Sequence, residues 1–192
     1  MQEAGYNRLK AVLGMFAAFS EQELEDIAAC FKPGTAPKHT FLLQEGSVCK
    51  AFYFITSGCI RTFFNDRNGR EKTRYVLMAN HIGTALTSFI SQAPSIECIE
   101  ALEDTEYLAI SYADFYRFNS SMPAWKHFYQ KILEMAYAFQ NRKIEQLVTL
   151  SARQRYEQVL RENPALVRML SNRVLASYLD IREETLSRLK SG

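Results

Sequence analysis

The most constraining feature of this 192-residue sequence is a change in the spacing of apolar residues near Met122-Pro123. Before it, from about residue 40 to 110, apolar residues come in short runs rich in aromatic and β-branched side chains, with turn residues between the runs. After it, they recur every three or four positions, which is the spacing of one face of an α-helix. The sequence therefore predicts a strand-rich part followed by a helical part.

The strand-rich part has six candidate strands, at residues 40–43, 51–56, 60–64, 73–78, 97–102 and 106–110. Asn68-Gly69 is a strong hairpin signal because both residues tolerate a positive φ. Strands at this spacing, without long helices between them, are typical of an antiparallel sandwich or barrel. We expect an α+β fold with an N-terminal antiparallel β-barrel of the jelly-roll type. Flanking helices are also expected, one of them starting at the capping box Ser20-Glu21-Gln22-Glu23.

A long helix is predicted over residues 122–150. One apolar stripe on it has the alternating steps of three and four that make a helix-helix seam, and consists of Trp125, Phe128, Ile132, Met135 and Phe139. Other apolar residues lie on further faces, so the helix needs more than one neighbour. Two interpretations stay open: the stripe covers the chain's own barrel, or it forms the interface of a homodimer.

The C-terminal segment, residues 151–192, is predicted to be helical as well. One helix covers 153–163 and ends at Pro164, residues 165–170 form a bridge, and two short helical patterns meet at Asp180-Ile181. This segment carries 8 Arg or Lys against 5 Asp or Glu, while the rest of the chain carries 15 against 16. The small basic surplus at this end is consistent with a nucleic-acid partner without identifying one.

This order of elements resembles the Crp/Fnr family of transcription regulators, the relatives of the cyclic-AMP receptor protein. The supporting phrases are Y-F-I-T-S-G-C-I-R at 53–61, N-G-R-E at 68–71, E-A-L-E-D-T-E-Y-L-A-I at 100–110 and A-S-Y-L-D-I-R-E-E-T-L-S-R at 176–188. The last resembles a branch motif, A-S-Y-L-G-I-x-x-E-T-L-S-R, with Asp180 in place of its glycine. The resemblance implies a sensor barrel with N-terminal helices at 1–121, a dimerisation helix at 122–150 and a winged-helix-like helix-turn-helix domain at 151–192.

The resemblance also implies that the last helix enters the major groove of double-stranded DNA. Arg188 is the strongest candidate base reader, because a guanidinium fork fits the O6 and N7 acceptors of guanine. Glu184 occupies the place of the family's glutamate. The complete set of candidate DNA-contacting residues is Asn172, Arg173, Arg182, Glu183, Glu184, Thr185, Ser187, Arg188 and Lys190. The implied partners are DNA, a second copy of the chain and RNA polymerase. The acidic residues 183 and 184 would repel DNA, so an alternative stays open in which the C-terminal helices bind a protein instead.

Relatives that bind cyclic AMP carry a Gly-Glu pair for the ribose and, further on, an Arg for the cyclic phosphate. Here Gly83 is kept, Thr84 replaces the glutamate, and Ser95 stands at the place of the arginine. A buried phosphate without a cation loses a charge-assisted hydrogen bond. We therefore expect an effector that is not cyclic AMP and whose identity is unknown, with Gly83, Thr84 and Ser95 as the candidate pocket residues.

Several other functions are disfavoured by the sequence. Four widely separated cysteines and three lone histidines lack the spacing of a metal, haem or iron-sulfur site, so no cofactor is expected. No catalytic constellation indicates an enzyme. No apolar stretch is long enough to cross a membrane, and residues 1–8 lack the apolar run of a signal peptide, so we expect a cytoplasmic protein with reduced thiols.

Overall fold

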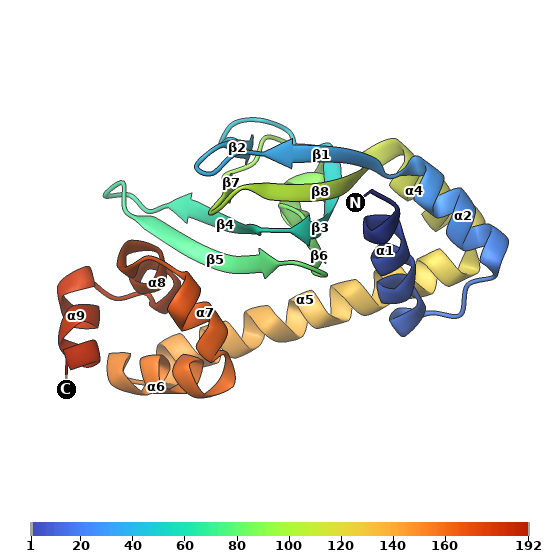
Figure 1. The fold of residues 1–192 in the computed structure, drawn as a ribbon. Helices are drawn as coiled ribbons and strands as arrows, with labels where there is room; N and C mark the ends of the chain where they lie inside the picture. The colour runs from blue at the N-terminus through green and yellow to red at the C-terminus, as the bar shows by residue number, and fades with distance from the viewer. Residues whose placement is uncertain (1, 192) are drawn as a thin grey trace. The chain divides into compact units, whose positions relative to one another are not determined.

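The structure is a computed structural model that describes residues 2–191 (Figure 1). It contains two compact units. The first consists of the chain up to Phe64 together with Tyr75–Leu133, and the second consists of Asn65–Arg74 together with the chain from Glu134 onward. The tip of one β-hairpin therefore belongs to the same unit as the C-terminal helices, and the long helix α5 (Pro123–Thr149) contributes to both units.

Two four-stranded antiparallel sheets form the centre of the first unit, which confirms the expected antiparallel sheets with flanking helices. Their strand orders are β1-β8-β3-β6 and β2-β7-β4-β5. The strands are β1 (Lys32–Ala36), β2 (Phe41–Leu43), β3 (Ala51–Ser57), β4 (Cys59–Asn65), β5 (Glu71–Met78), β6 (Ile82–Gly83), β7 (Cys98–Ala101) and β8 (Thr105–Ser111).

Four shorter helices accompany the sheets: α1 (Gln2–Phe16), α2 (Glu21–Cys30), α3 (Leu86–Ser91) and α4 (Tyr112–Ser121). In Figure 1, α1, α2 and α4 gather at one end of the sheets. The capping box predicted at the start of α2 is confirmed, because the Ser20 hydroxyl accepts from the Glu23 N–H and the Glu23 carboxylate accepts from the Ser20 N–H. Helix α4 had no counterpart in the sequence-based prediction. It follows β8 directly, and Ser111 caps it by accepting from the N–H of Asp114.

The core of the first unit is built from stacked and edge-on aromatic rings. The rings of Phe52 and Phe115 lie 5.0 Å apart, and those of Phe115 and Trp125 lie 5.1 Å apart. Trp125 and Phe128 have no exposed surface at all. These two residues of the predicted seam are therefore core residues and expose no surface that a second chain could contact. The first turns of α5 use their apolar stripe to pack on the aromatic residues of α4 and α1.

The second unit contains four more helices: α6 (Ala152–Glu162), α7 (Pro164–Met169), α8 (Asn172–Leu179) and α9 (Glu183–Ser191). Helix α7 replaces the expected bridge. Pro164 ends α6 as predicted, but it also begins α7, where a proline is tolerated because its missing N–H has no partner to lose. The Asn163 side chain caps α7 by accepting from the N–H of Leu166 at 3.1 Å.

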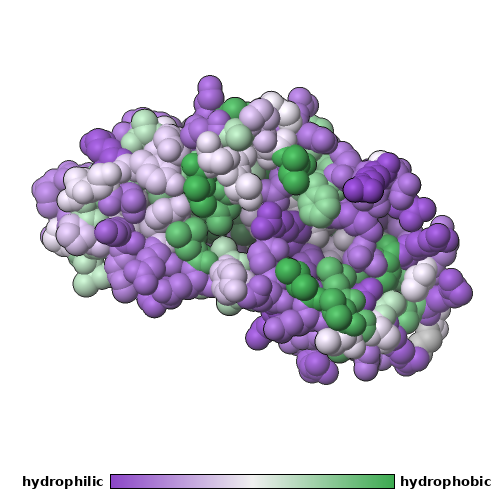
Figure 2. All heavy atoms as spheres, turned by 180° about the vertical axis from the view of Figure 1, so that it is seen from behind, coloured by the Kyte–Doolittle hydropathy of each residue, from purple (hydrophilic) through white to green (hydrophobic). Residues whose placement is uncertain are grey.

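Large apolar side chains are exposed along the C-terminal part of α5. Tyr137, Ile144 and Val148 expose 71%, 57% and 79% of their surface. Figure 2 shows apolar surface gathered in patches between hydrophilic areas on the face that it presents. Among residues 2–191, no helix combines the length and the apolar character needed to cross a lipid bilayer.

Candidate functional site

Helix α8 is anchored on its inner side and ends in a tight turn. Its apolar residues Val174, Leu175 and Leu179 are buried, and the Ser171 hydroxyl caps its first turn by accepting from the N–H of Val174. The helix ends at Asp180, which has left-handed backbone angles of φ 54° and ψ 49°. The branch motif has glycine at this position, and aspartate is among the residues that tolerate the left-handed conformation.

Helix α9 presents a polar face to solvent. Leu186 is fully buried and Leu189 is partly buried, and these residues hold the helix against its neighbours. The residues expected to face outward are exposed, namely Arg182, Glu183, Glu184, Ser187, Arg188 and Lys190, while Thr185 is partly buried. Acidic residues occupy the first turn of α9 and basic residues occupy its last turn, and this arrangement complements the helix dipole.

The side chains on this face have few internal partners. The Arg188 Nε donates to the backbone carbonyl of Glu184 at 3.3 Å, and the Lys190 ammonium donates to the Asn172 side-chain oxygen at 2.6 Å. Within residues 2–191, Arg182, Glu183 and Glu184 form no side-chain ion pair. Three charged groups at the start of α9 are thus available to an external partner.

The outer side of α8 is bound by the tip of the β4–β5 hairpin, which lies in the same unit. Arg173 forms an ion pair with Glu71, and Asp180 forms one with Lys72. Between these pairs, the Ser177 hydroxyl accepts from the N–H of Thr73 at 2.8 Å and lies 2.9 Å from the carbonyl oxygen of Glu71. Arg173 is one of the candidate phosphate contacts, and its guanidinium is already paired. No sequence signal indicated this contact, because the paired residues are about a hundred positions apart.

The hairpin turn itself differs from the two-residue turn that Asn-Gly predicts. Only Gly69 has a positive φ, at 72°. The Asp66 carboxylate accepts from the N–H groups of Asn68 and Arg70 at 2.8 and 3.0 Å, and these hydrogen bonds lower its pKa. The hairpin therefore ends in a longer loop that is closed by an aspartate side chain.

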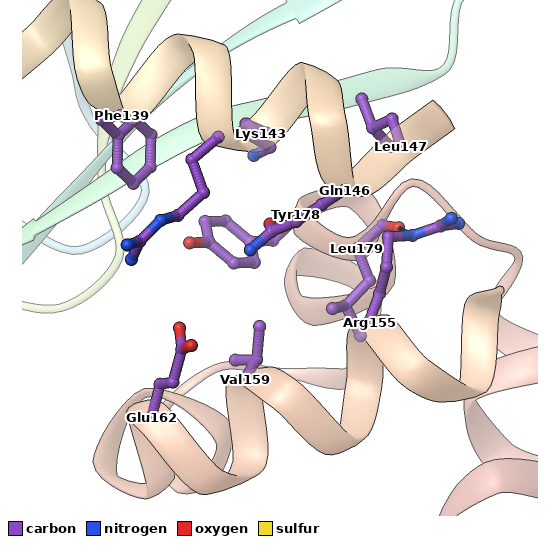
Figure 3. A pocket seen from close by; sticks show the side chains of 10 residues that line it. Phe139, Lys143, Gln146, Leu147, Arg155, Val159, Glu162, Tyr178 and Leu179 are labelled. Carbon is purple, nitrogen blue, oxygen red and sulfur yellow. Dashed lines mark hydrogen bonds between the residues drawn. The ribbon is translucent and has the colours of Figure 1, made fainter. Parts of the chain in front are cut away.

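Lys143 of α5 joins three elements of the second unit. Its ammonium donates to the carbonyl oxygens of Thr73 and Arg74, both at 2.8 Å, and lies 4.1 Å from the centre of the Tyr178 ring (Figure 3). Burial lowers the pKa of this amine to about 7, with a further contribution from the nearby Arg74, while Asp180 acts in the opposite direction. A lysine this deeply placed was not singled out in the sequence, because its helical position gives no sign of burial.

The candidate pocket residues of the first unit have hydroxyl groups that are already engaged. Thr84 and Ser95 expose only 2% and 4% of their surface. The Thr84 hydroxyl donates to the Ala51 carbonyl at 2.7 Å, and the Ser95 hydroxyl donates to the Glu97 carbonyl at 2.9 Å. At Gly83 a Cβ would lie 2.7 Å from a methyl group of Leu77, so a larger residue would require this side chain to shift.

A buried ion pair that no sequence pattern indicated crosses the second sheet. Arg61 of β4 and Glu100 of β7 expose 4% and 8% of their surface, and the Arg61 Nε donates to the Glu100 carboxylate at 2.7 Å. The guanidinium carbon also lies 4.0 Å from the centre of the Phe63 ring. The Glu100 carboxylate is therefore neutralised by an arginine within the sheet.

None of the histidines or cysteines within residues 2–191 forms a group that could hold a metal ion, and the four cysteines are free thiols. Burial raises the pKa of the Cys59 thiol to about 12, with a smaller contribution from Glu103. This thiol is therefore protonated at neutral pH and packs as a small apolar side chain.

Residues 34–121 match the family described as the cyclic nucleotide-binding domain. No curated protein matches the sequence.

Solved structures resemble the chain over most of its length. The c-di-GMP responsive global regulator CLP of Xanthomonas campestris is 16% identical, with a TM-score of 0.71 over 86% of this chain and 87% of that chain. The catabolite activator protein of Thermus thermophilus is 22% identical, with a TM-score of 0.61 over 94% and 85%. A protein from Eubacterium rectale assigned to the transcriptional regulators of the crp/fnr family is 16% identical, with a TM-score of 0.71 over 89% and 82%.

At these identities the likeness concerns the fold. Residues 34–121 therefore have the cyclic nucleotide-binding fold, and the structural neighbours of the chain are transcription regulators of the Crp/Fnr type.

Proposed function

We propose that this protein is a sequence-specific DNA-binding transcription regulator of the Crp/Fnr type. The observation that carries the proposal is the α8–α9 pair, in which a left-handed turn at Asp180 joins two short helices and the second exposes a continuous polar face. The two helices would act as a helix-turn-helix, with α9 in the major groove and α8 across the DNA backbone. The likeness in fold to known regulators supports this assignment.

Base readout would rest on the exposed face of α9. Arg188 can reach guanine, and Glu184 can accept from the amino group of cytosine. Arg182 and Lys190 would contact phosphates, and these contacts set register rather than sequence preference. Arg173 can join them only by leaving Glu71, so its phosphate contact requires the α8–hairpin contact to change.

The regulator would act as a homodimer through the exposed stripe of α5. Tyr137, Asn141, Ile144 and Val148 follow one another at steps of four, three and four, the spacing of a coiled-coil seam. This stripe takes the place of Trp125 and Phe128, which are buried in the core. A polar residue within such a seam, here Asn141, favours one register and one oligomeric state.

The effector of the first unit would not be a cyclic nucleotide bound in the family's usual manner. Thr84 and Ser95 have hydroxyl groups engaged with backbone carbonyls, and neither position carries a cation for a phosphate. Thermal unfolding with cyclic AMP and cyclic GMP tests this negative proposal. A saturable stabilisation of several degrees by either nucleotide would overturn it.

Selection of binding sites from random DNA duplexes tests the function itself. We expect enrichment of an inverted repeat whose half-site centres lie about 34 Å apart, because a two-fold dimer reads two half-sites one helical turn apart. If no inverted repeat is enriched, the proposal is wrong. If the chain also fails to retain any duplex at low salt, the alternative gains support, in which α8 and α9 form a protein-interaction module.

A further inference from the structure

A cleft of about 110 Å³ lies among helices α5, α6 and α8 of the second unit. Its walls are about equally apolar and polar, and Figure 3 shows Phe139 facing it from α5 and Val159 from α6, with the Tyr178 ring between them. A closed apolar cavity of roughly 150 Å³ holds a benzene-sized molecule. This cleft is smaller but open to solvent, so one ring or one short branched chain enters it in part.

Two polar groups at the cleft lack partners. Within residues 2–191, the Arg142 guanidinium has neither an ion pair nor a hydrogen bond, and the Tyr178 hydroxyl has no hydrogen bond. Burial and the nearby Glu162 raise the pKa of the Tyr178 phenol, so its hydroxyl stays protonated and can donate. Both residues line the cleft, so a guanidinium and a hydroxyl without protein partners are two donors available there to a carboxylate.

The electrostatic balance of the cleft also favours an anion. Arg142, Lys143 and Arg155 line it together with a single carboxylate, that of Glu162. Arg155 donates only to backbone carbonyls, so no carboxylate neutralises this cation by direct contact. Lys143 also donates to backbone carbonyls, and with a pKa of about 7 it carries only part of a positive charge at neutral pH. The surplus of positive charge attracts a small anion from solution.

We infer that this cleft binds a small monocarboxylate with an apolar body, an arylacetate or a branched short-chain acid, whose carboxylate contacts Arg142 and the Tyr178 hydroxyl. The apolar body lies between Phe139 and Val159. Glu162 repels a second negative charge, so dicarboxylates and phosphates are excluded. Helices α6 and α8 belong to the proposed DNA-binding domain, so the bound acid holds this domain against the end of α5. Regulation of DNA binding by the acid rests on the proposed function, whereas the binding of the acid does not.

Amide NMR spectra of the full chain, titrated with phenylacetate and with 3-methylbutanoate, test the binding. We expect saturable shifts confined to the ends of α5, α6 and α8, with a dissociation constant of about 1 mM or tighter for at least one acid. The neutral amides of the same acids have the same shape without the charge, and they should bind at least tenfold more weakly. No saturable shift with either acid, shifts centred on the first unit, or equal binding of the amides would each overturn the inference.

Two variants and a control locate the site. Arg142→Gln removes an exposed guanidinium and should weaken binding at least tenfold, whereas Arg153→Gln removes an exposed guanidinium of α6 outside the cleft and should leave binding unchanged. Val159→Phe fills the cleft and should abolish binding, and its amide spectrum shows whether the fold is kept. Equal affinities of Arg142→Gln and Arg153→Gln would overturn the inference even if Val159→Phe fails to fold. If the chain binds the acid but selects no DNA site, the proposed function is contradicted and the inferred acid-binding site is kept.

Discussion

The Lys143 ammonium lies 4.1 Å from the centre of the Tyr178 ring and donates to two backbone carbonyls of the β4–β5 hairpin. One cation thus connects α5, α8 and the hairpin tip. The carbonyls and the ring stabilise the charged form, but burial has the larger effect and lowers the pKa of the amine to about 7. The other charged or titratable groups around it are Arg142 on α5, Arg74 on the hairpin, Tyr178 and Asp180 on α8, and Arg155 and Glu162 on α6.

The first prediction concerns the pH dependence that follows. An unfolded lysine has a pKa of about 10.4, so between pH 7 and pH 10 the unfolded chain binds more protons than the folded chain, and stability rises with pH. The quantity to compare is the free energy of unfolding of the wild type minus that of Lys143→Met. This difference should increase between pH 7 and pH 10 by an amount on the order of 1–3 kcal/mol, after allowance for partial solvent screening. Urea unfolding at several pH values measures it. Lys126→Met, at an exposed lysine of the same helix, is the control and should give a constant difference; a constant difference for Lys143→Met as well contradicts the prediction.

The second prediction concerns the buried pair Arg61–Glu100. Arg61→Met leaves a carboxylate buried without its arginine, and should lower the free energy of unfolding by about 3–5 kcal/mol. Replacing both residues, as Arg61→Met with Glu100→Leu, removes the uncompensated charge and should recover most of that loss. Denaturant unfolding of the single and double variants measures this coupling. Additive losses of the two single variants in the double variant would mean that the two side chains are not energetically coupled, and would contradict the prediction.

The third prediction uses the left-handed conformation of Asp180. Asp180→Gly and Asp180→Ala both remove the ion pair with Lys72, so the difference between them isolates the backbone effect. The glycine variant should be more stable than the alanine variant by about 1 kcal/mol, because a Cβ disfavours this conformation. Thermal or urea unfolding gives the comparison. Equal stabilities would mean that the turn rearranges when the aspartate is lost.

The turn at Asp180 was predictable because its cause is local: a short helical pattern stops, and a residue that tolerates positive φ follows it. The neighbouring hairpin contact was not predictable, because pairs such as Arg173 with Glu71 are set by tertiary structure and leave no short-range pattern. The same distinction explains the helix seam. Trp125 and Tyr137 are both aromatic residues on apolar stripes of one helix. Trp125 is buried because α4 packs on it, whereas Tyr137 is exposed, and this difference is set by tertiary packing.

The fourth prediction concerns the homodimer. Ile144→Glu introduces a charge into the exposed stripe of α5 and should shift the chain from dimer to monomer, since a charge buried in an apolar interface is strongly unfavourable. Leu160→Glu is a matched control on α6, where a leucine exposes 43% of its surface outside that stripe. Analytical ultracentrifugation measures the masses of both variants. Dimers that persist in Ile144→Glu and dissociate in Leu160→Glu would move the interface to α6.

The fifth prediction separates base reading from phosphate binding on α9. Arg188→Ala should flatten the base preference at one position of each half-site and cost about 1–3 kcal/mol on the selected sequence, because a bidentate contact to guanine is lost. Lys190→Ala should instead weaken binding to all sequences by a similar factor. It should also reduce the slope of log affinity against log salt concentration by about one, as expected when one phosphate contact is lost. Competition binding with single-base variants of the selected site measures both effects. Arg153→Ala removes an exposed arginine of α6 that pairs with Glu157, and it is expected to preserve the base preference. A uniform loss for Arg188→Ala would assign this residue to the DNA backbone and leave Glu184 and Ser187 as the base readers.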